Sequence, residues 1–143
     1  MRDNSAQLSG YGILLVRSDQ NLLRGNGAAP DFSDGNVCSG IALLDADQNT
    51  ITGNTAAQNR SGPTGDSDGI FVDAFSRGTI LKANVTEMNT DDGIDVENRA
   101  TKLIGNTAND NDDRGIEAVP GVQANGNTAR GNTNPQCVNV VCA

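Results

Sequence analysis

The chain has 143 residues, the size of one domain, and carries 18 acidic against 10 basic residues, which gives a net charge of −8. That charge argues against binding to nucleic acid or to an anionic membrane, and no apolar run approaches the ~18 residues of a membrane-spanning helix. Because histidine is absent, Ser-His-Asp sites, Cys-His sites and histidine-bound zinc are excluded, and any chemistry rests on carboxylates, Lys, Arg, Tyr11 or a hard cation.

The composition fits either a disordered acidic segment or a repeat. Leu, Ile, Val and Phe account for only 30 residues, whereas Gly and Asn account for 35. A repeat is present, because a Gly-Ile pair recurs every 22 to 29 residues. The five pairs are Gly12-Ile13, Gly40-Ile41, Gly69-Ile70, Gly93-Ile94 and Gly115-Ile116.

Two further landmarks follow each Gly-Ile pair. A Gly-Asn or Ala-Asn pair comes 11 to 14 residues later, with its Asn at Asn26, Asn54, Asn84, Asn106 and Asn127. Another polar residue stands five positions after that Asn, at Asp31, Asn59, Asn89, Asn111 and Asn132. The near-constant spacing of three landmarks in five copies predicts a repeat fold.

The pattern within each unit is extended. Aliphatic residues alternate after the Gly, as in Ile41/Leu43 and Ile94/Val96, which is the period of two of a β-strand. A second short strand contains an inward aliphatic residue three positions before the landmark Asn, and a third follows that Asn. Units of this size cannot close a core alone, so we expect parallel coils stacked ~4.8 Å apart.

This repeat resembles that of right-handed parallel β-helices, the pectate-lyase-like and copper-processing β-helix repeat proteins. The resemblance covers residues 9–134 and implies an all-β, right-handed parallel β-helix, a solenoid of about five coils with a C-terminal cap. We expect a single domain over residues 1–143, with coils starting near residues 12, 40, 69, 93 and 115 and a cap over 133–143.

The Asn and Gly landmarks are predicted to be structural. Asn tolerates left-handed turns, and its amide can bond to the Asn above and below it in a stack. The Gly before each Ile is expected to let the backbone turn into the strand.

Two long loops and an apolar strip interrupt the regularity of the repeat. The loops, residues 32–38 and 60–67, are expected to project at the N-terminal end and either to form one wall of a cleft or to be neutral surface insertions. The strip contains Leu14, Val16, Leu44 and Phe71 on the outward side of the Gly-Ile strands. A folded-over loop, a second subunit or another part of a longer chain is expected to cover it, and we predict a homo-oligomer.

Carboxylates replace the apolar residues on the same outward face further along the chain. Asp73, Asp95, Glu97 and Glu117 are predicted to stand on neighbouring rungs about 5 Å apart. Asp91, Asp92, Asp112 and Asp113 add charge at the turns that lead into this face. Carboxylates this close repel one another, so one of them must hold a proton or a cation must lie between them.

The segment Asn89-Thr90-Asp91-Asp92-Gly93-Ile94-Asp95 resembles the Asn-Thr-Asp motif of polygalacturonases with one extra Asp, and Asp112-Asp113 resembles their Asp-Asp pair. The resemblance to polygalacturonases implies catalytic carboxylates on this strand face. The resemblance of the fold to β-helix polysaccharide lyases implies calcium-binding acids on the same face. The Gly-His-Gly and Arg-Ile-Lys segments of polygalacturonases have no counterpart in this chain.

Three interpretations of the acidic face remain open: a solvated surface, a hard-cation or glycan site, and an acid/base pair for hydrolysis. If the face is an acid/base pair for hydrolysis, the candidate catalytic residues are Asp95, Glu117, Asp73 and Glu97, and the distance between the two carboxyl groups would distinguish a retaining from an inverting glycosidase. If it is a cation site, the candidate ligands of Ca²⁺ are Asp91, Asp92 and Asp113. Arg114, the nearest basic residue, and Phe71 are candidate substrate-binding residues.

Cys137 and Cys142 bracket the last segment and are expected to form a local disulfide that fixes the cap, whereas Cys38 is expected to stay unpaired. A disulfide fits an exported protein, so we expect a secreted or periplasmic location, although the chain starts with no signal peptide. The sequence favours a hydrolase or lyase acting on an extracellular, uronate-containing or other glycan. The alternative is a noncatalytic glycan-binding or self-assembling β-helix module.

Overall fold

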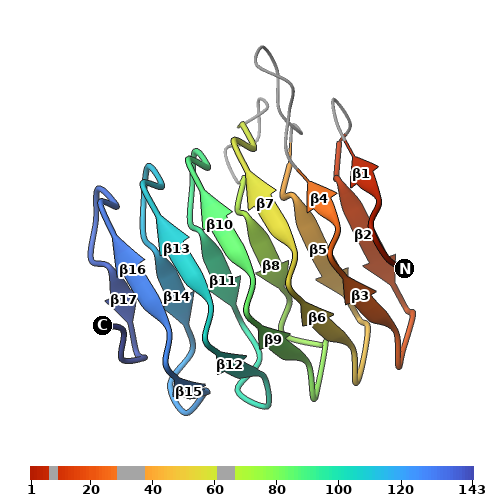
Figure 1. Cartoon of the computed structure of the whole chain (residues 1–143). Helices are drawn as coiled ribbons and strands as arrows, with labels where there is room; N and C mark the ends of the chain where they lie inside the picture. Colours follow the sequence, from red (N-terminus) through yellow and green to blue (C-terminus); the bar gives the residue numbers. More distant parts are fainter. Residues whose placement is uncertain (7–9, 29–37, 61–66) are drawn as a thin grey trace.

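The computed structural model describes residues 1–6, 10–28, 38–60 and 67–143. Throughout these residues the regular structure consists of parallel β-strands, which form three sheets stacked as a solenoid of about five turns (Figure 1). The predicted all-β solenoid is therefore confirmed. No helix within the described ranges is long and apolar enough to cross a bilayer.

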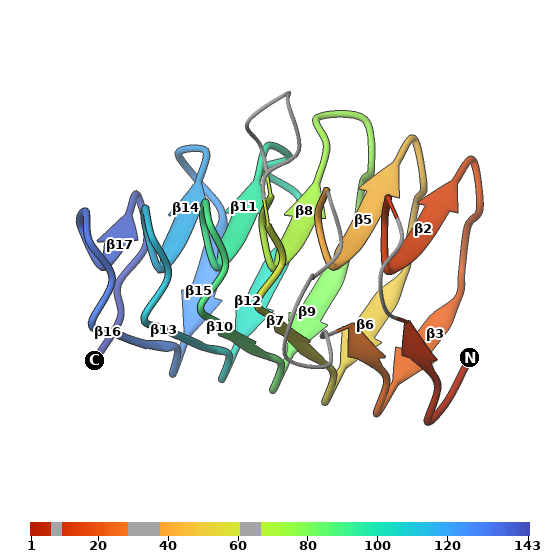
Figure 2. The same cartoon turned by 90° about the horizontal axis from the view of Figure 1, so that it is seen from above.

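Each coil contributes one strand to each sheet, and the strands of one sheet follow one another along the axis (Figure 2). The first sheet contains β2 (Ile13–Val16), β5 (Ile41–Leu44), β8 (Ile70–Val72), β11 (Ile94–Val96), β14 (Ile116–Ala118) and β17 (Cys137–Val138). The second contains β3 (Leu22–Arg24), β6 (Thr50–Thr52), β9 (Ile80–Lys82), β12 (Lys102–Ile104) and β15 (Gln123–Asn125). The third contains β1 (Ser5–Ala6), β4 (Gly27–Ala28), β7 (Thr55–Ala57), β10 (Val85–Glu87), β13 (Thr107–Asn109) and β16 (Thr128–Arg130).

The core consists of columns of equivalent residues in strict register. The Ile residues of the Gly-Ile pairs align with one another from Ile13 to Ile116, and those from Ile41 onward are completely buried. The second sheet adds an inward column that runs from Leu23 to Ala124, and the third adds small residues such as Ala108. Because every coil places the same residue at the same point, few aliphatic side chains suffice to fill the interior.

The landmark Asn residues form two continuous hydrogen-bonded ladders. In the first, the backbone N–H and side-chain Nδ2 of Asn54 both donate to Oδ1 of Asn84 at 3.0 Å, and Asn84 does the same to Asn106. The second runs through Asn59, Asn89, Asn111 and Asn132. The structural role predicted for these residues is confirmed. Asp31, the residue at the equivalent position in the first repeat, lies outside the described residues.

The Gly residues before Ile are required for a different reason from the one expected. A Cβ on Gly69 would lie 2.5 Å from the carbonyl oxygen of Gly93, and one on Gly93 would lie 2.6 Å from that of Gly115. Neither residue has a positive φ. Close approach of successive coils, and not a special turn, therefore excludes a side chain at these positions.

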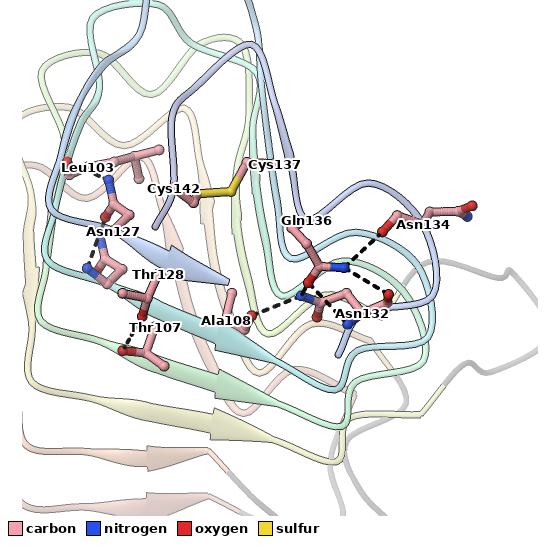
Figure 3. The surroundings of a disulfide bond; sticks show 11 residues. Leu103, Thr107, Ala108, Asn127, Thr128, Asn132, Asn134, Gln136, Cys137 and Cys142 are labelled. Carbon is pink, nitrogen blue, oxygen red and sulfur yellow. Dashed lines mark hydrogen bonds between the residues drawn. A yellow bond between two sulfur atoms is a disulfide. The ribbon is translucent and has the colours of Figure 1, made fainter. Parts of the chain in front are cut away.

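The cap contains the predicted Cys137–Cys142 disulfide, shown in Figure 3 beside the last members of both Asn ladders. Within the cap, β17 pairs with β14 of the first sheet. Cys142 forms an isolated backbone β-bridge with Asn127, which directly precedes β16 of the third sheet, so the cap covers the end of both sheets. The second ladder ends on Gln136, whose Oε1 accepts from the backbone N–H and Nδ2 of Asn132. Cys38 is free, as expected.

The apolar strip is less exposed than predicted. Leu14 and Val16 are exposed, by 41% and 50%, but Leu44 and Phe71 are only partly exposed. Ala42, which lies between Leu14 and Phe71 in the same column, is completely buried. The small side chain of Ala42 between two large neighbours explains why the uncovered area contracts to β2.

Candidate functional site

A cavity of about 370 Å³ lies on the outward side of the first sheet, where its central strands begin. It is lined by Tyr11, Cys38, Ser39, Asp68, Phe71, Asp91, Asp92, Asp95, Glu97, Arg114 and Glu117. These residues come from successive coils, and parallel pairing brings them together. The wall expected from residues 32–38 and 60–67 falls mainly on segments outside the described residues, but Cys38 at the end of the first segment does line the cavity.

Two columns supply most of the lining. The first is the outward column of the strands, in which Phe71, Asp95 and Glu117 stand on three consecutive rungs. The second, here called the preglycine column, consists of the residues directly before each Gly-Ile pair. Its members are Tyr11, Ser39, Asp68, Asp92 and Arg114. Backbone hydrogen bonds fix this register, since the N–H of each of the first four of these Gly residues donates to the carbonyl of the preglycine residue one coil further on.

Asp95 lines the cavity and binds a proton more tightly than an ordinary aspartate. Burial raises its pKa from 3.8 to about 7, and the negative charges of Glu117, Glu97 and Asp91 add to that effect. Arg114 acts in the opposite direction. A substantial fraction of Asp95 is therefore a neutral carboxylic acid near pH 7, able to donate a proton.

Glu117 lies beside that acid and forms an ion pair with Arg114. Its Oε2 accepts from Nη1 of Arg114 at 2.7 Å, which is the geometry of a charge-assisted hydrogen bond. One carboxylate oxygen from each of Asp92, Asp95 and Glu117 lies within 4.8 Å of the other two. The structure thus brings together the two predicted catalytic residues Asp95 and Glu117, with Arg114 beside them.

Asp92 is the most buried of the acids predicted as metal ligands, at 3% exposure. Burial raises its pKa to about 7, partly offset by the backbone N–H of Arg114, which donates to its Oδ1 at 2.7 Å. Asp91, Asp92 and Asp113 also place one oxygen each within 4.8 Å of one another. Two ligands of a single Ca²⁺, each at 2.3–2.6 Å from the ion, lie no more than ~5 Å apart, so this all-oxygen set fits a hard cation.

Arg114 lies among these acids. Its Nη1 is 3.3 Å from Asp113 and 3.8 Å from Asp92, in addition to its contact with Glu117. Burial acts to lower the pKa of Arg114, but the surrounding carboxylates outweigh it and raise the pKa further. Arg114 therefore stays charged and can neutralise part of the cluster or contact an anionic group, but it cannot act as a base.

Asp68 is a site residue that was not predicted from the sequence. It is only 5% exposed and lines the cavity, with Oδ2 3.4 Å from Oγ of Ser39. Burial raises its pKa to about 8, reinforced by the charges of Asp95, Asp91 and Asp92. The signal was available, since Asp68 precedes Gly69-Ile70 as Asp92 precedes Gly93-Ile94. The residue directly before a Gly-Ile pair can therefore line the same face as the outward residues that follow the pair.

The structure does not bring Asp73 to the cavity. Its carboxylate instead accepts from the backbone N–H groups of Asp45, Phe75 and Ser76, and from Oγ of Ser76 at 2.6 Å. The placement of Asp73 on the acidic face was wrong because its carboxylate is held by these turn hydrogen bonds, whereas Glu97, at the equivalent position after β11, does line the cavity. Asp73 therefore organises a turn.

The other predicted residues lie at or near the cavity. Phe71 and Asp91 are half-buried in its wall, and Glu97 lines it while remaining exposed. Asp113 does not line the cavity but contacts Arg114. Asp112 is exposed and also lies off the lining.

The architecture and the repeat define a class, the right-handed β-helices. Residues 1–141 match the family described as right handed beta helix region, so the chain belongs to that family. No curated protein matches the chain at a significant level.

Proposed function

We propose that the chain is a carbohydrate-active β-helix protein that hydrolyses a glycan by a retaining mechanism, with Asp95 as general acid and Glu117 as nucleophile. The two residues lie between two hollows on the outward side of the first sheet, and this arrangement carries the proposal. On one side is the 370 Å³ cavity, and on the other a hollow of about 300 Å³, lined in part by Val119, Pro120 and Asn139. Both hollows include Asp95 and Glu117, so a polymer could place sugar units on each side of the acids.

The chemistry follows from the difference between the two carboxyl groups. Glu117, ionised beside Arg114, would attack the anomeric carbon while Asp95 transfers its proton to the leaving glycosidic oxygen. Water activated by the now ionised Asp95 would then release the sugar from Glu117. The 4.8 Å limit on their oxygen separation suits the ~5–5.5 Å of retaining enzymes better than the ~6.5–9.5 Å of inverting ones.

A lyase is less well supported by the same contacts. A lyase needs a base near the acids, and the basic residue in the cavity lining is Arg114, whose charge its carboxylate partners stabilise. The cavity is also strongly acidic, with Asp68, Asp91, Asp92, Asp95, Glu97 and Glu117 against Arg114. Neutral glycans are therefore better suited to it than uronate-containing ones. The Cys137–Cys142 disulfide supports action in an oxidising compartment, secreted or periplasmic.

The test uses aryl glycosides and neutral polysaccharides with three variants. Glu117→Gln should abolish turnover of every substrate. Asp95→Asn should abolish hydrolysis of polysaccharides but still release dinitrophenolate from 2,4-dinitrophenyl glycosides in a burst, because that leaving group needs no protonation; the second step, which needs Asp95 as base, should then be slow. The control is Asp112→Asn, which removes an exposed carboxylate off the cavity.

The product stereochemistry and the pH profile complete the test. NMR of the first product should show retained anomeric configuration, and activity should fall as the pH rises through about 7, where Asp95 loses its proton. Activity that survives in Glu117→Gln would refute the assignment of the nucleophile. No turnover of any glycan, with binding unaffected by Asp95→Asn, would leave the noncatalytic glycan-binding module as the function.

A hard-cation site is the second candidate function. It is favoured by the two sets of oxygens, Asp91/Asp92/Asp113 and Asp92/Asp95/Glu117, each within 4.8 Å. Ca²⁺ there would relieve the repulsion between these acids in competition with Arg114. At a hundred times its dissociation constant it should stabilise the fold by ~2.7 kcal/mol, and Asp92→Asn should remove that gain. Identical melting curves in Ca²⁺ and in EDTA would exclude the site.

A further inference from the structure

The outward face of the second sheet differs in charge from the rest of the molecule. One outward column consists of Leu22, Thr50, Ile80, Lys102 and Gln123, and the other of Arg24, Thr52, Lys82, Ile104 and Asn125. Neither column contains an acid, although the chain has 18 acidic and only 10 basic residues. The face is therefore purely cationic on a molecule of net charge −8.

The charges on this face are not neutralised by neighbouring acids. Arg24, Lys82 and Lys102 are exposed, and in the described ranges the ion pairs involve Arg17 and Arg114 and none of these three. Arg2, also exposed, pairs with Arg24 through a backbone bridge and extends the same column. Unpaired cations on a rigid face attract an anionic partner.

The arrangement of this face suits a linear polymer. Its strands follow one another along the solenoid (Figure 1), so its side chains repeat every ~4.8 Å along one axis. Near the C-terminal end of the sheet, a hollow of about 190 Å³ is lined by Lys102, Leu103, Ile104, Gln123, Ala124 and Asn125. That hollow is smaller than the ~300–1,000 Å³ of drug-sized sites, and its ammonium, amide and aliphatic groups match the charge, hydroxyls and C–H face of one sugar ring.

We propose that the outward face of the second sheet binds a linear anionic polysaccharide that lies along the solenoid axis. Arg24, Lys82 and Lys102 would contact its carboxylate or sulfate groups, and Ile80 and Ile104 would contact the sugar rings between them. The hollow of about 190 Å³ beside Lys102, and the aliphatic side chains next to the cations, favour a polysaccharide over an acidic peptide, because together they offer a contact surface for a sugar ring. This surface is separate from the cavity on the first sheet and does not depend on any catalysis there.

The test compares binding to three polymers that share one backbone: neutral dextran, carboxymethyl-dextran and dextran sulfate. The chain should bind the two charged polymers and not neutral dextran, and binding should weaken as salt rises from 0.05 to 0.5 M. Lys82→Gln/Lys102→Gln should weaken binding about five- to tenfold, as expected for the loss of two exposed charge pairs. The matched control, Arg17→Gln/Arg130→Gln, removes two positive charges from outside this face and should change affinity by less than about twofold.

Each other result overturns the proposal in a defined way. Equal loss in both double variants would mean that binding follows net charge and not this face. Equally tight binding of poly-L-glutamate would replace the polysaccharide with an acidic polypeptide. Absence of binding to either charged dextran at low salt would remove the surface altogether, whatever the activity of Asp95 and Glu117.

Discussion

Asp68 offers the sharpest test of the electrostatics of the cavity. Asp68→Asn keeps the size of a side chain that is 5% exposed but removes its ability to ionise. Asparagine can still accept from Ser39, as the carboxylate does. The variant therefore isolates the cost of charging one buried group.

The magnitude and the sign follow from the pKa of Asp68. Because burial raises that pKa from 3.8 to about 8, the folded chain keeps a proton that the unfolded chain has already released between these pH values. The stability contributed by this group is complete below about pH 4 and is lost as the pH rises to about 8. At ~1.36 kcal/mol per pH unit, a rise from 3.8 to about 8 corresponds to a loss of roughly 6 kcal/mol, an upper limit because relaxation and water entry reduce it.

The measurement is urea unfolding of the wild type and Asp68→Asn at pH 5, 6, 7 and 8. The variant should be at most ~1.5 kcal/mol more stable than the wild type at pH 5, and this advantage should grow to a few kcal/mol at pH 8. Asp112→Asn, at an exposed position off the cavity, should follow the wild type throughout. If the difference in unfolding free energy between the wild type and Asp68→Asn stays constant from pH 5 to 8, Asp68 does not titrate in this range and its pKa is not raised by burial.

Two further predictions concern the interior. Asn84→Ala removes the acceptor of Asn54 and a donor to Ile51 and should cost about 3 kcal/mol or more in urea unfolding, whereas the exposed Asn125→Ala should change stability by less than ~0.5 kcal/mol. Thr79 is completely buried and its hydroxyl has no hydrogen-bond partner, so Thr79→Val should raise stability by ~1 kcal/mol; a loss would show that the hydroxyl is satisfied.

The fold could be predicted because the repeat specifies it at each level. Gly-Ile pairs, inward aliphatic residues and Asn landmarks recur with the period of the coil, and each marks a residue that the structure places in a column. The reason for the Gly residues was not accessible, because the distance from Gly69 to the carbonyl of Gly93 depends on how closely successive coils approach.

The site could be predicted only in part, since the repeat fixes register but not the contacts of each side chain. Asp95 and Glu117 lie within strands, and their position on one face follows from the period of two. Asp73 has the register of Glu97, but its carboxylate accepts hydrogen bonds from Phe75 and Ser76 in the turn that follows β8, and the repeat does not reveal those contacts. The burial of Asp68 could not be predicted at all, because it depends on the turn that precedes the strand.

Self-association remains a prediction, and the structure sharpens where to test it. Within the apolar strip, the exposed side chains are Leu14 and Val16 on β2. β2 is the last strand of the first sheet at its N-terminal end and pairs with β5 alone among the described strands. An uncovered strand edge with exposed aliphatic side chains favours pairing with another chain. Light scattering should therefore give a mass above 14.8 kDa, and Leu14→Lys/Val16→Lys should lower it to that of the monomer. Because Leu44 is already partly buried, Leu44→Lys is expected to reduce stability instead, and a monomeric wild type would refute association through β2.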